Sequence, residues 1–229
     1  MAAKLKVLSA GAVEGPVREL TPAFMRDTGH DVELSINTVG ALKDRFTAGE
    51  AADAIILSFP AIEALQKDGR LRAGSRTDLG RASCGVAVRD GMLMPDISTP
   101  EAFQRALVNA QTIGANDPAH GGSSGIYLAE LLDKLGMTEQ LKPKMVLGKT
   151  GREVAFLVAT GRAELGITFT SEFIAVEGTR VVGPLPKGME YVNGYAGALP
   201  NEASAAAAAY LSFLASPPSK ACFRRFGLE

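Results

Sequence analysis

Short apolar runs alternate with segments of helical hydrophobic spacing along the first third of the chain. Strands are predicted at 4–9, 31–36 and 53–57, and small or polar residues and then a helix pattern follow each one. Pro16 suits the first turn of the first helix. Strands that alternate with helices form parallel sheets, so we expect the carboxyl ends of these strands at one edge, where open α/β sheets bind ligands.

The same alternation continues through the rest of the chain. Thr99 is a suitable N-cap for a helix that begins with Pro100 and Glu101. Together with the first third, this pattern predicts an α/β fold. The remaining predicted elements are strands at 81–88, 144–147 and 165–169, helices at 99–109, 152–160 and 203–214, and a short terminal helix that ends near 226.

The stretch from Thr112 to Leu135 has the clearest chemistry. A short strand leads to the loop Gly121-Gly122-Ser123-Ser124-Gly125, after which apolar residues follow a helical spacing from Ile126 onward. A loop that runs directly into a helix leaves backbone N–H groups without intrahelical partners. Those donors, the two hydroxyls and the positive end of the helix dipole together favour an anion.

The sequence of this loop is compatible with other interpretations. A flexible linker is disfavoured because strand and helix signals bound the loop closely. A phosphate loop is excluded because no Lys-Ser or Lys-Thr follows the glycines. Gly121-x-Ser123-x-Gly125 matches the nucleophile elbow of esterases, but that fold needs a histidine after the serine, whereas His30 and His120 both precede it. A glycine-rich helix start that packs without any ligand stays open.

Composition narrows the class of partner. The 229 residues carry a net charge of −1 with no long run of either sign, which argues against nucleic acid and a membrane surface. No apolar run reaches membrane-spanning length, so no membrane insertion is expected. Cys84 and Cys222 form no metal-ligand pattern, and neither a metal nor a cofactor is predicted. The chain starts on a strand rather than a signal peptide, which predicts a cytoplasmic location if it is full length and a periplasmic one if a leader was removed.

Segments along nearly the whole chain resemble the molybdate-binding protein family of periplasmic-type solute-binding proteins. Each segment is short, and their order and spacing carry the resemblance. The segments are Val7-Leu8-Ser9-Ala10-Gly11-Ala12, Thr28-Gly29, Gly40-Ala41-Leu42, Ala48-Gly49, Ala52-Asp53, Asn116-Asp117-Pro118-Ala119-His120, Ser124-Gly125-Ile126-Tyr127, Leu165-Gly166-Ile167 and Phe223-Arg224-Arg225-Phe226-Gly227.

This resemblance implies a two-lobe, periplasmic-binding-protein-like α/β fold that closes on a ligand in the cleft between its lobes. Each lobe would be a mixed, mostly parallel sheet flanked by helices, and two crossing strands would join them. Lobe 1 is expected at 1–80 plus 195–229 and lobe 2 at 85–185, with hinge crossings at 81–84 and 186–194.

Members of the family hold a tetrahedral oxyanion with hydroxyls, backbone N–H groups at helix starts and a tyrosine. Here Ala12, Val39 and Phe169 stand where the family is rich in hydroxyls. Each absent donor forfeits a hydrogen bond worth roughly 1.5–3 kcal/mol, which disfavours molybdate. The positions that match the family's ligand contacts are Ala12 and Val39, with Thr38 beside it, and Ser124, Gly151 and Phe169.

Apolar residues at an anion site favour a ligand with an acidic end and a carbon body, so a small organic acid is predicted. Arg152, at the start of its helix, is the charged candidate for a bidentate clamp. The other predicted ligand-binding residues are Ser123 and Ser124 for the carboxylate, Phe59 and Phe169 for the carbon skeleton, and Ser9 and Gly11 beside Ala12.

Two functions stay open at this point. A binding protein would deliver its small anion to an ABC transporter permease or act as a sensor. An enzyme on the same fold, an isomerase, tautomerase or decarboxylase, would move a proton on a small organic acid. Binding is favoured because the resemblance places a histidine at 120 in proteins that only bind. The candidate bases for the enzyme are His120, Glu14, Asp117 and Glu172.

Overall fold

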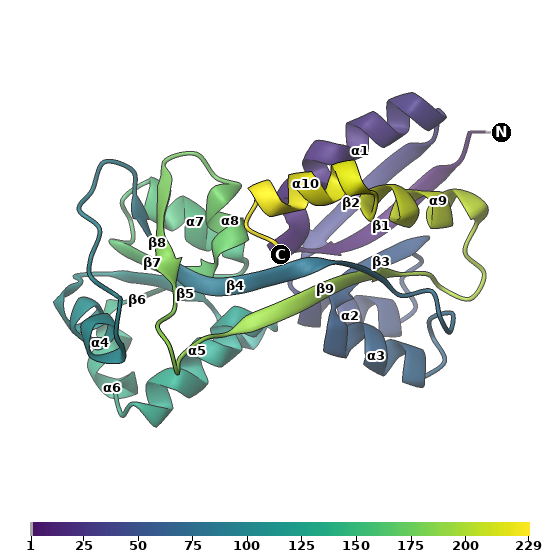
Figure 1. Ribbon diagram of the computed structural model, residues 1–229. Helices are drawn as coiled ribbons and strands as arrows, with labels where there is room; N and C mark the ends of the chain where they lie inside the picture. The colour runs from purple at the N-terminus through teal and green to yellow at the C-terminus, as the bar shows by residue number, and fades with distance from the viewer. Residues whose placement is uncertain (1) are drawn as a thin grey trace. The chain divides into compact units, whose positions relative to one another are not determined.

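The polypeptide crosses twice between two separate folding units. The computed structural model describes residues 2–229. Unit 1 consists of Met1–Ala82 and Asn193–Glu229, and unit 2 consists of Ser83–Val192. The chain leaves unit 1 within strand β4 (Thr77–Arg89) and returns at the start of strand β9 (Val192–Ala198) (Figure 1).

The sheet of unit 1 has the strand order β2-β1-β3-β9. Its first three strands are parallel, and β9 is antiparallel to β3. Ala10 pairs with Asn37, and Ser58 pairs with Tyr195. The carboxyl ends of the three parallel strands therefore lie at one edge, which confirms the sequence prediction. The bounds are β1 Lys4–Ala10, β2 Asp31–Asn37 and β3 Ala54–Ser58.

Helices cover both faces of this sheet. Helices α1, α9 and α10 pack on one face, and α2 and α3 on the other (Figure 1). Apolar residues such as Leu8, Leu42, Ile55 and Ile62 are fully buried in the core beside α2 and α3. A short 3-10 turn, Gly11–Val13, leads into α1. The helices are α1 Glu14–Thr28, α2 Val39–Thr47, α3 Phe59–Lys67, α9 Ala205–Leu214 and α10 Pro217–Arg225.

The sheet of unit 2 has the order β4-β7-β5-β6, with β8 paired to the other side of β4. Strand β5 is parallel to β6 and β7, whereas β4 is antiparallel to β7 and β8. Strand β8 was not predicted, because this partly exposed strand ends in Gly183-Pro184 and shows little alternation. The predicted α/β class is confirmed. The bounds are β5 Ile113–Asn116, β6 Met145–Gly148, β7 Leu165–Phe169 and β8 Thr179–Pro184.

Helices also cover both faces of the second sheet. Helices α7 and α8 lie on one face and α5 on the other, where α4 and α6 also lie (Figure 1). Residues Val154 and Val158 of α7 pack with Phe173 of α8 in a buried core. The helices are α4 Pro100–Asn109, α5 Ser123–Lys134, α6 Thr138–Leu141, α7 Gly151–Ala159 and α8 Thr170–Ile174, with 3-10 turns at Pro118–His120 and Lys142–Lys144.

Helix α5 differs from its prediction at its first turn. It begins at Ser123, so both serines belong to the helix rather than to the preceding loop. Ile126, predicted on the apolar face, is 41% exposed, whereas Leu128 and Leu131 are buried. The buried face is set by the packing of α5 on β5 and β7 and not by the apolar spacing alone. Within residues 2–229, no helix combines the length and the apolar character that a membrane crossing needs.

Candidate functional site

A buried polar cluster lies at the carboxyl ends of β5 and β7 in unit 2. Asn116 ends β5, Thr168 is the next-to-last residue of β7, and both side chains are buried with Ser124 and Glu172. The Thr168 hydroxyl lies 2.8 Å from Asn116 Oδ1, 2.5 Å from Glu172 Oε2 and 3.1 Å from Ser124 Oγ. Ser124 Oγ also donates to Asn116 Oδ1 at 3.2 Å. One hydroxyl thus joins two strand ends and two helix starts.

The glycines before α5 let the helix start approach Asn116. A Cβ on Gly125 would lie 2.4 Å from the Asn116 carbonyl oxygen, closer than real Cβ atoms come. A Cβ on Gly122 would lie 3.2 Å from the Asn116 amide nitrogen. Gly121 has φ +68°, a left-handed conformation that suits glycine. These glycines have a packing role whether or not a ligand binds.

The carboxyl group of Glu172 lies directly against the amino end of α7. A Cβ built on Gly151, the first residue of that helix, would lie 1.9 Å from Glu172 Oε2 and 2.2 Å from Oε1. Glu172 also stands in the first turn of its own helix, α8. Helix amino ends stabilise negative charge, and Thr168 donates a hydrogen bond to the same carboxyl group. These contacts offset the cost of burying it.

Cys84 lies close enough to Glu172 for their charges to interact. It pairs with Phe169 across β4 and β7 and is 1% exposed. Burial, reinforced by the negative charge of Glu172, raises the pKa of the Cys84 thiol to about 12. The thiol therefore stays protonated at neutral pH and is a poor nucleophile.

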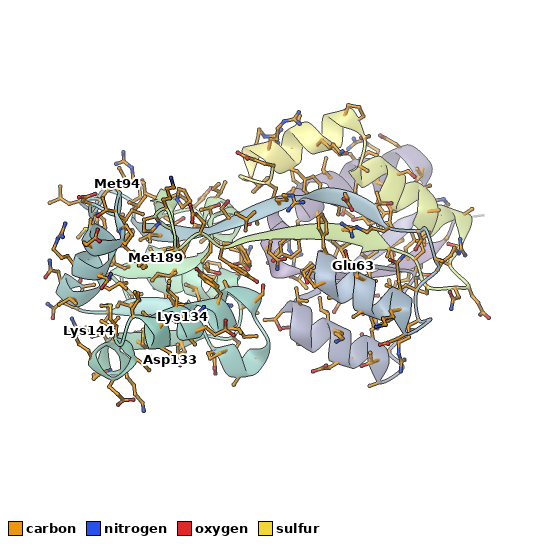
Figure 2. The ribbon with its side chains drawn as sticks, turned by 60° about the horizontal axis from the view of Figure 1, so that its bottom comes forward. Glu63, Met94, Asp133, Lys134, Lys144 and Met189 are labelled. Carbon is orange, nitrogen blue, oxygen red and sulfur yellow. The ribbon has the colours of Figure 1, made fainter. Side chains whose placement is uncertain are left out.

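Aromatic rings form a wall beside the start of α5. The rings of Tyr127 and Tyr191 stack at 4.4 Å with an interplanar angle of 6°, and Phe169 lies 5.9 Å from Tyr191. The Tyr127 hydroxyl donates to the Met189 carbonyl at 3.0 Å, which fixes the stack. Figure 2 labels Met189 in unit 2. We call Tyr127, Phe169 and Tyr191 the aromatic wall.

Tyr191 supplies a hydroxyl near the position where Phe169 has none. It forms a side-chain hydrogen bond with Ser123, the first residue of α5. Burial raises the pKa of Tyr191 although this bond lowers it, so the phenol remains a proton donor at neutral pH. Tyr191 is not among the predicted site residues, since only the chain's tertiary path brings it beside Phe169.

In unit 1, the predicted residues at the strand ends contact the protein's own backbone. Thr38 is buried, and its hydroxyl caps α2 by accepting from the Ala41 N–H at 3.2 Å. Ser9 is fully buried, with its hydroxyl 3.5 Å from the Ala10 carbonyl. Ala12 is also buried, while Gly11 is partly exposed. Ser58 was not predicted as a site residue. It stands at the N-cap position of α3, but its side chain makes no capping hydrogen bond.

Val39 and Phe59 pack against the core of unit 1. A Cβ on Gly194 would lie 2.3 Å from the Phe59 ring, so the ring is seated on the backbone of β9. The Arg76 guanidinium stacks 3.9 Å from the ring centroid, and the Arg81 guanidinium lies at 5.4 Å. These contacts give Phe59 a structural role that the prediction of a ligand contact did not include.

The remaining predicted charged residues have protein partners. His120 Nδ1 lies 3.0 Å from Asp117 Oδ2, and His120 is exposed. Arg18 Nε donates to Glu14 Oε1 at 2.6 Å one turn along α1. The Arg152 guanidinium lies 5.1 Å from the Phe156 ring on the same helix. Of the candidate bases, Glu172 alone belongs to the buried cluster with Ser124 and Thr168. The structure thus gathers Ser123, Ser124, Gly151, Phe169 and Glu172 at one edge of the unit 2 sheet.

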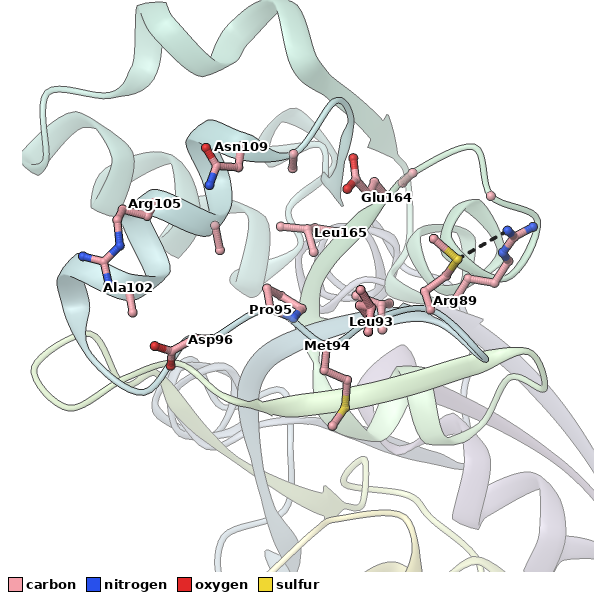
Figure 3. A pocket seen from close by; sticks show the side chains of 16 residues that line it. Arg89, Leu93, Met94, Pro95, Asp96, Ala102, Arg105, Asn109, Glu164 and Leu165 are labelled. Carbon is pink, nitrogen blue, oxygen red and sulfur yellow. Dashed lines mark hydrogen bonds between the residues drawn. The ribbon is translucent and has the colours of Figure 1, made fainter.

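A hollow of about 580 Å³ lies at the opposite edge of the unit 2 sheet (Figure 3). It is lined by the loop from Met92 to Pro95, by α4 and by Leu165, the first residue of β7. None of the predicted site residues lines it. Its acids are already bonded: Asp96 accepts from the Ser98 N–H and hydroxyl, and Glu164 accepts from the Gln111 N–H. Among the described residues, no group of three or more His, Cys, Asp or Glu side chains could hold a metal ion.

Known proteins resemble this chain over nearly its whole length. An aconitate isomerase from a Pseudomonas species is 32% identical over 98% of this chain and 87% of its own length. The molybdate-binding protein ModA of Escherichia coli is 26% identical over 98% of this chain and 88% of its own. The periplasmic molybdate-binding protein of Azotobacter vinelandii, at 19% identity, has the same fold with a TM-score of 0.79, covering 98% of both chains.

The family model for bacterial extracellular solute-binding proteins matches residues 5–229. This match and the ModA relatives confirm the resemblance drawn from the sequence. The chain therefore belongs to the family of bacterial extracellular solute-binding proteins.

Proposed function

We propose that this protein binds a small organic acid with more than one carboxylate. The observation that carries the proposal is the pairing of hydroxyl donors with an aromatic wall at the start of α5. Ser123 and Tyr191 bear the donors, and Tyr127 and Phe169 extend the wall. A carboxylate would accept from the hydroxyls and from the amino end of α5, whose N-cap is Gly122 and so has no capping side chain.

The flat wall favours a ligand with a planar carbon skeleton. The stacked rings of Tyr127 and Tyr191 offer an apolar face next to the donors. A tetrahedral oxyanion has no carbon body to place there, whereas an unsaturated polycarboxylate has one. The name of the aconitate isomerase relative supports this class of ligand, and the names of the ModA relatives support the oxyanion alternative.

Thermal-shift measurements would test the ligand class. We expect cis- and trans-aconitate or related di- and tricarboxylates to raise the melting temperature in a concentration-dependent way, since a ligand that binds only the folded state stabilises it. Molybdate, tungstate and sulfate serve as the comparison set. Stabilisation by the oxyanions and by none of the acids would refute the proposal.

Family membership favours a place of action outside the cytoplasm, with transfer of the bound acid to an ABC transporter permease. The cytoplasmic alternative has no support from the relatives. Co-purification with a permease encoded nearby, dependent on bound ligand, would test this partner. A chain that stays with the cytoplasmic fraction in its native host would count against it.

A second candidate function is isomerisation of an unsaturated acid. The observation that favours it is the buried carboxyl of Glu172, together with the relative named aconitate isomerase. An ionised Glu172 would take a proton from a methylene carbon next to a carboxylate, and the electron pair would delocalise over the neighbouring double bond. The resulting acid would return the proton to the far end of that system, so the double bond moves and no atom is lost.

NMR in deuterated water would test this activity. We expect the protein to interconvert an unsaturated acid such as aconitate and to exchange deuterium at its methylene group. Glu172→Gln should abolish both, whereas Glu153→Gln, which changes an exposed acid of α7, should leave both intact. An unchanged spectrum after prolonged incubation with the wild-type protein would leave binding as the function.

A further inference from the structure

We propose that the carboxyl group of Glu172 is a built-in anion that fills the amino end of α7 and excludes tetrahedral oxyanions from it. The inference rests on the proposed function, since it names the residue that restricts this site to organic acids. It concerns unit 2 alone and follows from the contacts of Glu172 with Gly151 and Thr168.

The amino end of α7 has the features of an anion site. The helix has nine residues, its N-cap Thr150 accepts from the Glu153 N–H, and its first residue is Gly151. Its dipole and its terminal N–H groups favour a negative group at that position. Both oxygens of Glu172 lie within 2.2 Å of the point where a Gly151 Cβ would be. The protein's own carboxyl group therefore takes the place of a ligand.

Gly151 and Glu172 depend on each other. Any side chain at 151 would overlap the Glu172 carboxyl group, so only glycine leaves room for it. The hydroxyl of Thr168 also contacts the carboxyl group, at 2.5 Å from Oε2. The carboxyl group thus contacts the amino end of α7 and the carboxyl end of β7. Any other rotamer of Glu172 would lose both contacts.

An incoming oxyanion meets two obstacles at this point. The space beside Gly151 is already filled, and an ionised Glu172 repels a second anion strongly in a buried setting. An organic acid would avoid the filled space and reduce the repulsion, because its carboxylate would bind at the α5 start while a carbon atom faces Glu172. Ser124 of α5 contacts Thr168, Thr168 contacts Glu172, and Glu172 lies against Gly151 of α7. The starts of α5 and α7 are therefore linked through the side chains of Thr168 and Glu172.

Calorimetric titration of three proteins with sodium molybdate, sodium tungstate and sodium sulfate tests the proposal. The proteins are the wild type, Glu172→Gln and the matched control Glu153→Gln. Glu153 belongs to the first turn of α7 but is exposed, and it accepts from the Lys149 N–H. Because both variants replace glutamate by glutamine, they change the net charge equally. We expect Glu172→Gln to bind at least one oxyanion about tenfold or more tightly than the wild type, and Glu153→Gln to match the wild type.

Circular dichroism would show whether Glu172→Gln is folded, and Glu172→Ala, which removes both charge and bulk, provides a second variant. Oxyanion affinity that stays at the wild-type level in a folded variant would overturn the proposal. Tight molybdate binding by the wild type would overturn it without any variant. Failure of organic acids to bind the wild type would instead remove the proposed function, and the oxyanion titrations would still decide the role of Glu172.

Discussion

A buried pair of hydroxyl groups occurs in each unit, and these two pairs have different surroundings. In unit 1, Thr21 and Tyr210 lie 2.7 Å apart between α1 and α9. Thr21 also donates to the Val17 carbonyl, and Phe24 packs edge-on against Tyr210 with ring centroids 5.0 Å apart. In unit 2, Ser124 and Thr168 lie 3.1 Å apart at the carboxyl ends of strands.

The difference in surroundings makes the unit 2 pair the better candidate for a functional site. The unit 1 pair lies beside the Phe24 ring and links α1 to α9, so we interpret its hydrogen bond as structural. The unit 2 pair joins an amide and a carboxyl group beside the open end of a helix. Burial alone therefore does not identify a site. A position at the strand ends, where several helices begin, is the stronger reason to propose one.

The largest effect is expected from Gly125→Ala in unit 2. The added methyl would meet the Asn116 carbonyl oxygen at 2.4 Å, so α5 must move away from β5. We expect a loss of about 3 kcal/mol of stability and loss of organic-acid binding, measured by urea unfolding and calorimetry. The control is Gly183→Ala, where the nearest atom lies at 3.8 Å and little change is expected. Equal effects of both variants would show that close approach of α5 is not what holds the cluster.

Thr168→Val should have the next largest effect. It removes the hydroxyl that lies within hydrogen-bond distance of both Asn116 Oδ1 and Glu172 Oε2, so one buried oxygen loses its donor. We expect a cost of about 2 kcal/mol in unfolding experiments and at least a tenfold loss of organic-acid affinity. Thr160→Val is the matched control, because that hydroxyl bonds to carbonyls of its own helix. Wild-type affinity in Thr168→Val would mean that the unit 2 pair is structural, like that of unit 1.

Tyr210→Phe should affect stability and leave ligand binding unchanged. The lost hydrogen bond to Thr21 costs about 1 kcal/mol at neutral pH. Burial raises the pKa of Tyr210 from 10.0 to about 12. A raised folded-state pKa stabilises the fold fully below pH 10, and this contribution is lost as the pH rises through about 12. Alkaline unfolding of Tyr210→Phe, followed by circular dichroism, should lack this decrease in stability between pH 10 and about 12. Any loss of ligand affinity would contradict the structural role.

The smallest effect is expected from Glu50→Gln on the surface of unit 1. Hydrogen bonds from Arg45 and Lys6 lower the pKa of Glu50 from 4.5 to about 2. A lowered folded-state pKa contributes stability above pH 4.5 that is lost as the pH falls through about 2. Melting temperatures should therefore differ between wild type and variant at pH 7 and converge near pH 2. Glu202→Gln, at an exposed acid in a loop, serves as control. A difference that persists at pH 2 would exclude this ion pair as its cause.

Local pattern was sufficient for most elements. Strand β7 was predicted at its observed bounds, and Thr99 caps α4 as expected by accepting from the Ala102 N–H. Strand β8 and the exposure of Ile126 were not predicted. Both depend on which neighbour covers a segment, and that information is not contained in the periodicity of the segment itself.

The sequence by itself determined the alternation of strands and helices, the glycine- and serine-rich start of α5 and the family to which the chain belongs. It also named Ser123, Ser124 and Glu172 as candidates, and their roles stay predictions. Only the tertiary structure decided that Thr168 joins Asn116 and Glu172, that Tyr191 meets Ser123 and that Glu172 fills the space beside Gly151. The physical reason is distance along the chain: Asn116 and Thr168 are 52 residues apart, and strand pairing rather than any local preference brings them into contact.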